Sequence, residues 1–161
     1  DEPAAVMLDG ASRSQGKRSL RVVNRVSGGS LGVWCGMRRF DAAKYPVLRF
    51  DYCVPPATRV NLYFRAGGQW FCVGLSAPDA FEEGARTLTS LPGFAADGRW
   101  HTARVDVLDV LRRALPAGAR PVVEDLWIRA PRVEYLRSGF GGNGLGAEYR
   151  LDDFRLVGAR K

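Results

Sequence analysis

Apolar and polar residues alternate with a period of two along most of this sequence, and glycine or proline interrupts the alternation at short intervals. Residues 48–54 alternate in this way until Pro55-Pro56, and residues 60–65 do so until Gly67-Gly68. Such runs predict short β-strands, whereas only residues 109–115, before Pro116, suit a helix. We therefore predict an all-β protein: a β-sandwich (jelly roll) of two antiparallel sheets with at most one short helix.

The size of the chain indicates one domain. Its 161 residues are 46% hydrophobic, enough for a single core, so we predict one β-sandwich domain over residues 1–161. No apolar run is long enough to span a membrane. No basic and then apolar leader precedes Asp1, so we expect a mature product or an excised module.

The net charge of +7 comes almost wholly from arginine. A basic surface suits an acidic polysaccharide, a nucleic acid or an anionic membrane, although it also simply keeps a domain soluble. The basic residues are spread along the chain rather than gathered in one block, so we expect no nucleic-acid partner.

The sequence lacks the residues of common catalytic and metal sites. His101 is the only histidine, on a strand position that faces the core, and the cysteines (Cys35, Cys53 and Cys72) have no zinc-type or thioredoxin-type spacing. One disulfide with one free thiol remains an alternative. The adjacent acidic pairs, such as Glu82-Glu83, point to opposite faces of a strand, but distant pairs such as Asp51 with Glu83 stay open. We expect no enzyme, with a jelly-roll hydrolase or lyase as the minority alternative.

Aromatic residues mark a candidate ligand site. Trp34, Tyr63 and Trp70 occupy positions that should face away from the core. The register places four polar side chains nearby, namely Arg49, Asp51, Asn61 and Arg65. Sugar rings stack their apolar C–H faces on aromatic rings while polar groups fix their orientation, so these seven residues are the predicted ligand-binding set. The alternative is that loops or a neighbouring domain cover this face. We assign Trp100 and Trp127 to structure.

Four segments together resemble the galactose-binding-like jelly rolls of carbohydrate-binding modules. They are Ser14-Gln-Gly-Lys-Arg-Ser-Leu-Arg-Val22, Tyr45-Pro-Val-Leu-Arg-Phe-Asp-Tyr52, Asp97-Gly-Arg-Trp-His101 and Tyr149-Arg-Leu-Asp-Asp-Phe-Arg-Leu156. The resemblance implies a non-catalytic module of a larger secreted or cell-surface protein that binds a polysaccharide. The positive net charge makes an acidic or sulfated glycan one candidate ligand. The alternative function is a structural or protein-interaction accessory domain with no sugar site.

The same resemblance implies a structural calcium ion where the first and last strands meet. Its ligands would be Asp152, Asp153, carbonyl groups near Gly16 and Lys17, and a carboxylate near the amino end, either Glu2 or Asp9. Calcium prefers six to eight oxygen ligands, which carboxylates and carbonyls supply. The alternative is that Asp152-Asp153 only bulges the last strand and caps nearby amides.

Overall fold

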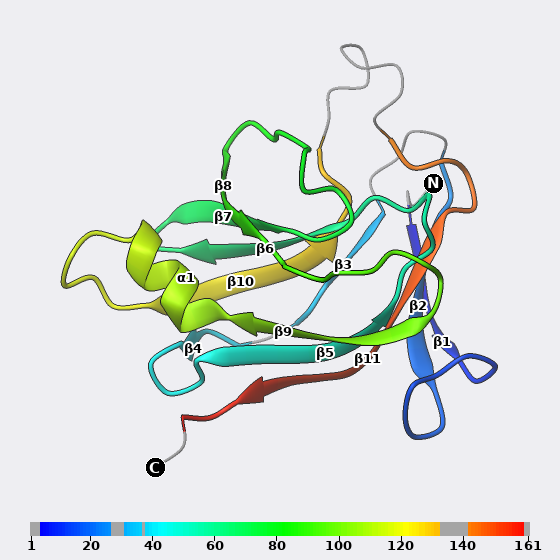
Figure 1. The fold of residues 1–161 in the computed structure, drawn as a ribbon, viewed down its shortest axis with the longest axis horizontal. Coiled ribbons are helices and arrows are strands. Elements are labelled where there is room, and N and C mark those ends of the chain that lie inside the picture. The colour runs from blue at the N-terminus through cyan, green and yellow to red at the C-terminus, as the bar shows by residue number, and fades with distance from the viewer. Residues whose placement is uncertain (1–3, 27–30, 37, 133–141, 160–161) are drawn as a thin grey trace.

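The computed structural model describes residues 4–26, 31–36, 38–132 and 142–159. In order, its elements are β1 (Ala4–Asp9), β2 (Ser19–Asn24), β3 (Gly32–Trp34), β4 (Phe40–Asp41), β5 (Val47–Cys53), β6 (Asn61–Ala66), β7 (Gln69–Gly74), β8 (Ala85–Ser90), β9 (Trp100–Asp106), α1 (Val107–Ala114), β10 (Val122–Arg129) and β11 (Glu148–Val157). The strands form two sheets, and α1 lies at one end of them (Figure 1). The predicted β-sandwich with at most one short helix is confirmed for the described part of the chain.

The two sheets interleave distant parts of the chain. Sheet A has the order β1-β2-β11-β5-β9, and sheet B has the order β3-β10-β6-β7-β8, with β4 also paired to β10. Neighbouring strands are antiparallel as predicted, except that β7 and β8 run parallel. Parallel neighbours require a crossover connection, which residues 75–84 supply. This connection, which we call the crossover loop, is held against β6 by hydrogen bonds to Asn61.

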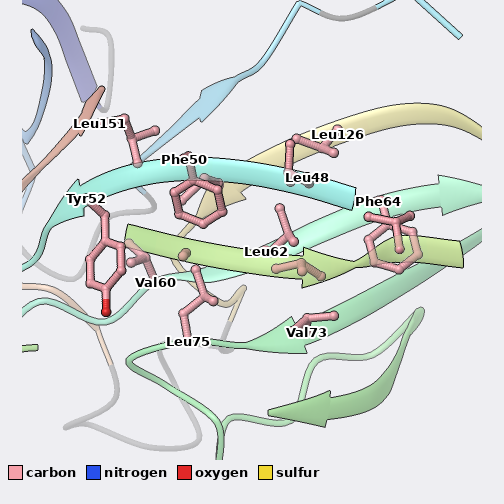
Figure 2. Close-up of a cluster of buried hydrophobic side chains, with 14 of the residues drawn as sticks. Leu48, Phe50, Tyr52, Val60, Leu62, Phe64, Val73, Leu75, Leu126 and Leu151 are labelled. Carbon is pink, nitrogen blue, oxygen red and sulfur yellow. The ribbon is translucent and has the colours of Figure 1, made fainter. Parts of the chain in front are cut away.

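The core lies between the sheets. Leu48, Phe50 and Tyr52 of β5 point toward Leu62 and Phe64 of β6 across the sandwich (Figure 2). All five side chains are buried, whereas their neighbours on each strand point to the opposite side. The alternation seen in the sequence therefore gives the inward side of these two strands correctly.

Turn chemistry fixes the ends of several elements. Gly67 and Gly68 connect β6 to β7 with φ angles of 57° and 77°, values that glycine adopts readily. Asp106 caps α1, because its side chain accepts a hydrogen bond of 2.9 Å from the Asp109 amide. The helix therefore starts two residues before the predicted range of 109–115. No helix in the described ranges is long and apolar enough to cross a membrane.

Four strands differ from the sequence expectation, and one of them, the two-residue strand β4, was not predicted. Apolar residues alternate over residues 31–37, which predicts a longer strand there, but β3 covers only Gly32–Trp34 because Gly36 turns the chain with a φ of 57°. The strands β1 and β8 were not predicted, since neither alternates clearly: Ala4–Asp9 is apolar over five successive residues and Ala85–Ser90 is largely polar. Both lie at the edges of their sheets, where burial imposes less pattern.

Candidate functional site

The outward side of β3, β10, β6 and β7 forms one surface of sheet B, which we call the tryptophan face. Strand pairing places Trp34 opposite Trp127 and Trp127 opposite Tyr63. One step along the strands, Arg65 lies opposite Trp70. The predicted aromatic residues Trp34, Tyr63 and Trp70 therefore do share one face of one sheet.

The crossover loop covers one end of this face. Asn61 holds the loop, because its Oδ1 accepts the Leu75 amide at 2.8 Å and its Nδ2 donates to the Ala77 carbonyl at 2.8 Å. The loop passes so close that a Cβ at Gly74 would lie 2.7 Å from Pro78 Cα, so glycine is required there. Asn61 is buried and its amide is fully engaged, so its prediction as a sugar-binding residue is wrong.

Tyr63 is also unavailable to a ligand. Its side chain is fully buried, and the guanidinium of Arg129 lies 3.7 Å from its ring centroid. Arg129 in turn pairs with Glu82 of the crossover loop through contacts of 2.5 and 2.9 Å. The prediction that Tyr63 stacks on a sugar is therefore wrong, because a loop distant in sequence brings this ion pair over the ring.

Electrostatics keep the covering pair charged. Burial alone would raise the pKa of Glu82, but hydrogen bonds from Arg129 and from the Arg132 amide, together with the Arg129 charge, hold that pKa below its ordinary value. The side chains of Arg129 and Glu82 are about nine-tenths buried. They form a fixed wall at the covered end of the tryptophan face.

Three indoles remain accessible. Trp34 is 55% exposed, and Trp127 and Trp70 are half-buried. One carboxylate orients two of them: Asp125 accepts the Trp34 indole N–H at 2.5 Å and the Trp127 indole N–H at 3.3 Å. Trp127 was assigned to structure in the sequence analysis, yet its position between inward-facing Leu126 and Ile128 was the signal that it faces outward.

A pocket of about 320 Å³ opens beside the indoles of Trp70 and Trp127. Its wall combines two aromatic rings with acidic, basic and small residues: Trp70, Glu82, Glu83, Gly84, Ala85, Asp125, Trp127, Arg129 and Arg132. Aromatic area with a few convergent polar groups is the usual composition of a small-molecule site. Three of the lining side chains are carboxylates and two are guanidiniums, so the wall is not basic.

Arg49 and Asp51 lie elsewhere. Their strand, β5, belongs to sheet A, and both side chains lie on its outward side. Arg49 pairs with Asp153 there, and Asp51 accepts hydrogen bonds from Thr102 at 2.6 Å and Ser14 at 2.7 Å. The prediction that Arg49 and Asp51 join the aromatic residues is wrong, because the two sheets place them on opposite sides of the sandwich.

The network on sheet A lowers the pKa of Asp51. Burial opposes ionisation and would raise that pKa, but hydrogen bonds from Thr102 and Ser14 and the charge of Arg49 outweigh it. Asp51 is therefore ionised and buried beneath the turn that contains Ser14. Its role is to hold that turn against sheet A.

The residues expected to bind calcium do not fit the ion as they are arranged. Asp152 accepts the amides of Ser14 and Gln15 at 3.0 and 2.9 Å through Oδ2, and the Asp153 amide at 2.8 Å through Oδ1. Asp9 instead binds the Arg150 guanidinium at 2.8 Å. Asp152 and Asp9 therefore already accept hydrogen bonds from N–H donors through the oxygens that a cation would need.

Asp152-Asp153 has the bulge and the capped amides that the alternative interpretation describes, while the structural calcium ion stays a prediction. The register of β11 shifts after Asp152, and Asp153 has a φ of 44°, so the pair bulges the strand and caps amides. Gly16 turns the nearby chain with a φ of 61°, the Lys17 side chain is exposed, and Glu2 lies outside the described residues. Across those residues no group of three His, Cys, Asp or Glu side chains is placed to hold a metal.

The histidine and the three cysteines are the remaining side chains with possible reactivity. His101 lies beside the Tyr52 ring and contacts Asp97 at 2.8 Å, but its side chain is about one-third exposed, so it lies at the margin of the core rather than inside it as predicted. All three cysteines are free thiols, so the alternative of one disulfide is not formed. Burial raises the pKa of Cys35 to about 12 and that of Cys72 to about 11, which keeps both protonated at neutral pH.

No family model matches the sequence, and no curated protein matches it either. Solved structures do resemble the fold. The family 30 carbohydrate-binding module of a cellulosomal cellulase from Clostridium thermocellum aligns with a TM-score of 0.58 and 13% identity, covering 97% of this chain and 83% of that chain. The family 11 module of another cellulosomal cellulase from the same organism aligns with a TM-score of 0.50 and 13% identity, covering 100% and 86%.

A third similar structure is an enzyme. A β-1,2-glucanase from Parabacteroides distasonis aligns with a TM-score of 0.51 and 14% identity, covering 98% of this chain but 22% of the enzyme. At these identities the likeness shows a shared fold. The predicted resemblance to the jelly-roll fold of carbohydrate-binding modules is thus confirmed, and the neighbours aligned over most of their length are binding modules rather than enzymes.

Proposed function

We propose that this protein is a non-catalytic carbohydrate-binding module that binds a polysaccharide on the tryptophan face. The observation that carries the proposal is Asp125, whose carboxylate orients the indoles of Trp34 and Trp127 on an open face of sheet B. A solvated sheet face gains nothing from holding an exposed tryptophan in a fixed orientation. A stacking ligand gains affinity from it, because the ring is ordered before binding.

The accessible side chains suit a sugar chain. Trp34, Trp127 and Trp70 offer apolar rings for the C–H faces of pyranose units. Glu83, Asp125 and Arg132 around the pocket supply acceptors and donors for hydroxyl groups, and Arg65 lies on the same face. Each hydrogen bond to such a charged group contributes roughly 1.5–3 kcal/mol, and the rings add area burial.

The charges favour a neutral glycan over an acidic or sulfated one. The pocket wall holds three carboxylates, from Glu82, Glu83 and Asp125, against two guanidiniums, from Arg129 and Arg132. Arg65 on the same face is already within 3.5 Å of Glu124. The overall charge of +7 is therefore carried elsewhere on the surface and would not concentrate anions at the pocket.

We place the domain in a larger secreted or cell-surface protein. Two of the similar structures are modules of cellulosomal cellulases, and the glucanase contains a comparable fold as about a fifth of its chain. These contexts are those of the similar proteins. They support, for this domain, a role in holding an attached activity against a polysaccharide.

Isothermal titration calorimetry with neutral and sulfated oligosaccharides tests the proposal. Trp34→Ala and Trp127→Ala should each lower affinity for a neutral glycan by about tenfold or more, since each removes a stacking platform. Tyr45→Ala is the matched control, because Tyr45 is an exposed aromatic residue that precedes β5 of sheet A. Unchanged affinity in folded tryptophan variants, or binding confined to sulfated glycans, would overturn it.

The second candidate is an accessory domain with no sugar site. It is favoured by the crossover loop, which already buries Tyr63 and Asn61 and so removes part of the face. A folded protein that binds none of a broad glycan array would make this function the better one.

A further inference from the structure

The first strand of sheet A is an unprotected edge. The six residues of β1 pair in regular antiparallel register with β2, and β1 is the last strand of its sheet. Val6, Met7 and Leu8 are 49%, 39% and 64% exposed, and the strand contains no lysine, arginine or proline. Edge strands in natural proteins are usually guarded by charge, proline, a bulge or a covering segment. Within the described residues β1 has no proline, bulge or covering segment, and its one charged residue, Asp9, lies at the end of the strand and is paired with Arg150.

The opposite edges of the same molecule are guarded. The outward side chains of β9, the other edge of sheet A, include Arg104 and Asp106, both exposed. The edge strand β8 of sheet B exposes Arg86, Thr87 and Thr89. The edge strand β3 of sheet B also lacks charge and proline, but it is only three residues long, so β1 is the longer unguarded edge.

An apolar cleft of about 390 Å³ lies beside β1, between the margins of the two sheets. Its lining is mostly apolar and ends in a few polar groups: Leu8, Arg18, Ser19, Leu20, Val33, Trp34, Cys35, Gly36, Leu151, Asp152, Asp153 and Phe154. Leu8 is paired with Leu20, so its side chain projects to the same side of sheet A as the cleft. A strand added to β1 would direct alternate side chains to this side.

Basic residues flank both ends of the edge. Lys17 and Arg18 precede Ser19, which pairs with Asp9 at one end of β1, and Arg25 follows Asn24, which pairs with Ala4 at the other. The Lys17, Arg18 and Arg25 side chains are exposed, and none forms a salt bridge within the described residues. An apolar strand between two basic ends is complementary to a segment with an apolar centre and acidic ends.

We propose that β1 is a docking edge for an extended peptide segment that is apolar at alternate central positions and acidic at both ends. The segment adds a strand to sheet A through main-chain hydrogen bonds, and its inward side chains enter the cleft. A second copy of this chain is a poorer occupant. Two β1 strands paired about a two-fold axis would bring the basic end at Arg18 against the basic end at Arg25.

The test is a binding measurement with a synthetic probe. The probe is a fluorescein-labelled peptide of alternating Val and Thr between Asp-Asp flanks, followed by anisotropy against the folded protein. One comparison peptide carries Lys-Lys flanks, and another has a proline in its centre, which blocks strand pairing. The protein variants are Leu8→Lys and Val6→Lys, which place a guard on exposed positions of β1, with Tyr45→Lys as the matched control.

Saturable binding of the acidic probe, weakened about tenfold or more by Leu8→Lys or Val6→Lys but not by Tyr45→Lys, is the expected result. The proposal would be overturned if the acidic probe did not bind, or if the Lys-flanked or proline-containing peptide bound as tightly as the acidic probe. It would also be overturned if both lysine variants bound the acidic probe as tightly as the wild-type protein does. Sedimentation of the protein alone as a dimer that Leu8→Lys abolishes would also overturn it, in favour of a second copy. Glycan affinity should be unchanged in Val6→Lys, because Val6, unlike Leu8, does not line the cleft that contains Trp34 of the sugar site, so failure here and failure of the sugar site are distinguishable with this variant.

Discussion

The guanidinium of Arg129 lies 3.7 Å from the ring centroid of Tyr63. The same guanidinium pairs with Glu82, so one side chain connects the outward face of sheet B to the crossover loop. This relationship divides the tryptophan face into a covered end, where Tyr63 and Asn61 support the loop, and an open end, where the indoles remain accessible. The pocket lies at the boundary between the two ends.

Arg129→Met should destabilise the protein strongly. The substitution leaves the buried Glu82 carboxylate without its partner, which typically costs about 3–5 kcal/mol. Urea denaturation followed by circular dichroism measures the change in the free energy of unfolding. Arg113→Met is the control, since the Arg113–Asp109 pair is more than half exposed and should contribute less than about 1 kcal/mol. Equal losses in the two variants would contradict the role given to Arg129.

Asp125→Ala should weaken glycan binding while leaving the fold intact. Both indole N–H groups lose their acceptor, so Trp34 and Trp127 become free to reorient, and we expect about a tenfold loss of affinity. Calorimetry gives the affinity, and near-ultraviolet circular dichroism reports the ordering of the indoles. Glu124→Ala is the matched control, because this neighbouring carboxylate contacts Arg65 and Arg39 instead. Equal effects of the two substitutions would argue against orientation by Asp125.

Local pattern in the sequence was enough to predict which side of the alternating strands faces the core. Trp34 and Trp70 were correctly placed on the outward side, and the same alternation held the information for Trp127. The helix and the Gly67-Gly68 hairpin followed from equally local signals. These features depend on residues a few positions apart, which is the range over which alternation and turn chemistry act.

The predictions that were wrong concern features that depend on contacts between distant segments of the chain. Arg49 and Asp51 were grouped with the aromatic residues because nothing in β5 itself says which sheet it joins, and its partner β11 lies about a hundred residues later. Tyr63 and Asn61 were expected to be accessible because the path of the crossover loop cannot be read from β6. Sheet membership and loop coverage arise from the whole chain, so the composition of the site could be predicted only in part.

Stability should fall at acidic pH, in part through Asp51. In the folded protein the pKa of Asp51 lies below its ordinary value, which is near 4. The ionised carboxylate therefore contributes its full share of the free energy of unfolding above about pH 4, and this share is lost as the pH falls through the lower pKa of the folded state. Asp51→Asn should lower the free energy of unfolding at pH 7 by about 1–3 kcal/mol and flatten its decline below about pH 4. Denaturant titrations across pH measure both effects.

The exposed Asp79 provides the control for this acid transition. Asp79→Asn removes a carboxylate that contacts Arg59 at 3.0 Å with most of its own side chain in solvent, so it should leave the pH profile nearly unchanged. If the stability of Asp51→Asn declined at acidic pH as that of the wild-type protein does, the pH dependence of stability would arise elsewhere. Glu148 and Asp9 are the candidates, because arginine side chains also lower their pKa values.

Thermal stability should not depend on calcium. A ligand that binds only the folded state raises its stability in proportion to RT ln(1 + [L]/Kd), so a structural ion would shift the Tm on removal by EDTA. Here Asp152 accepts hydrogen bonds from backbone amides and Asp9 accepts one from the Arg150 guanidinium, so we expect the same Tm in millimolar calcium and in EDTA.

Asp152→Ala should lower the free energy of unfolding by about 1–3 kcal/mol under both conditions, because the Ser14 and Gln15 amides lose their acceptor. Lys17→Ala, which changes only an exposed side chain on the same turn, is the control. A Tm raised by several degrees in calcium, and lost in Asp152→Ala, would show instead that these carboxylates rearrange to hold the ion implied by the resemblance.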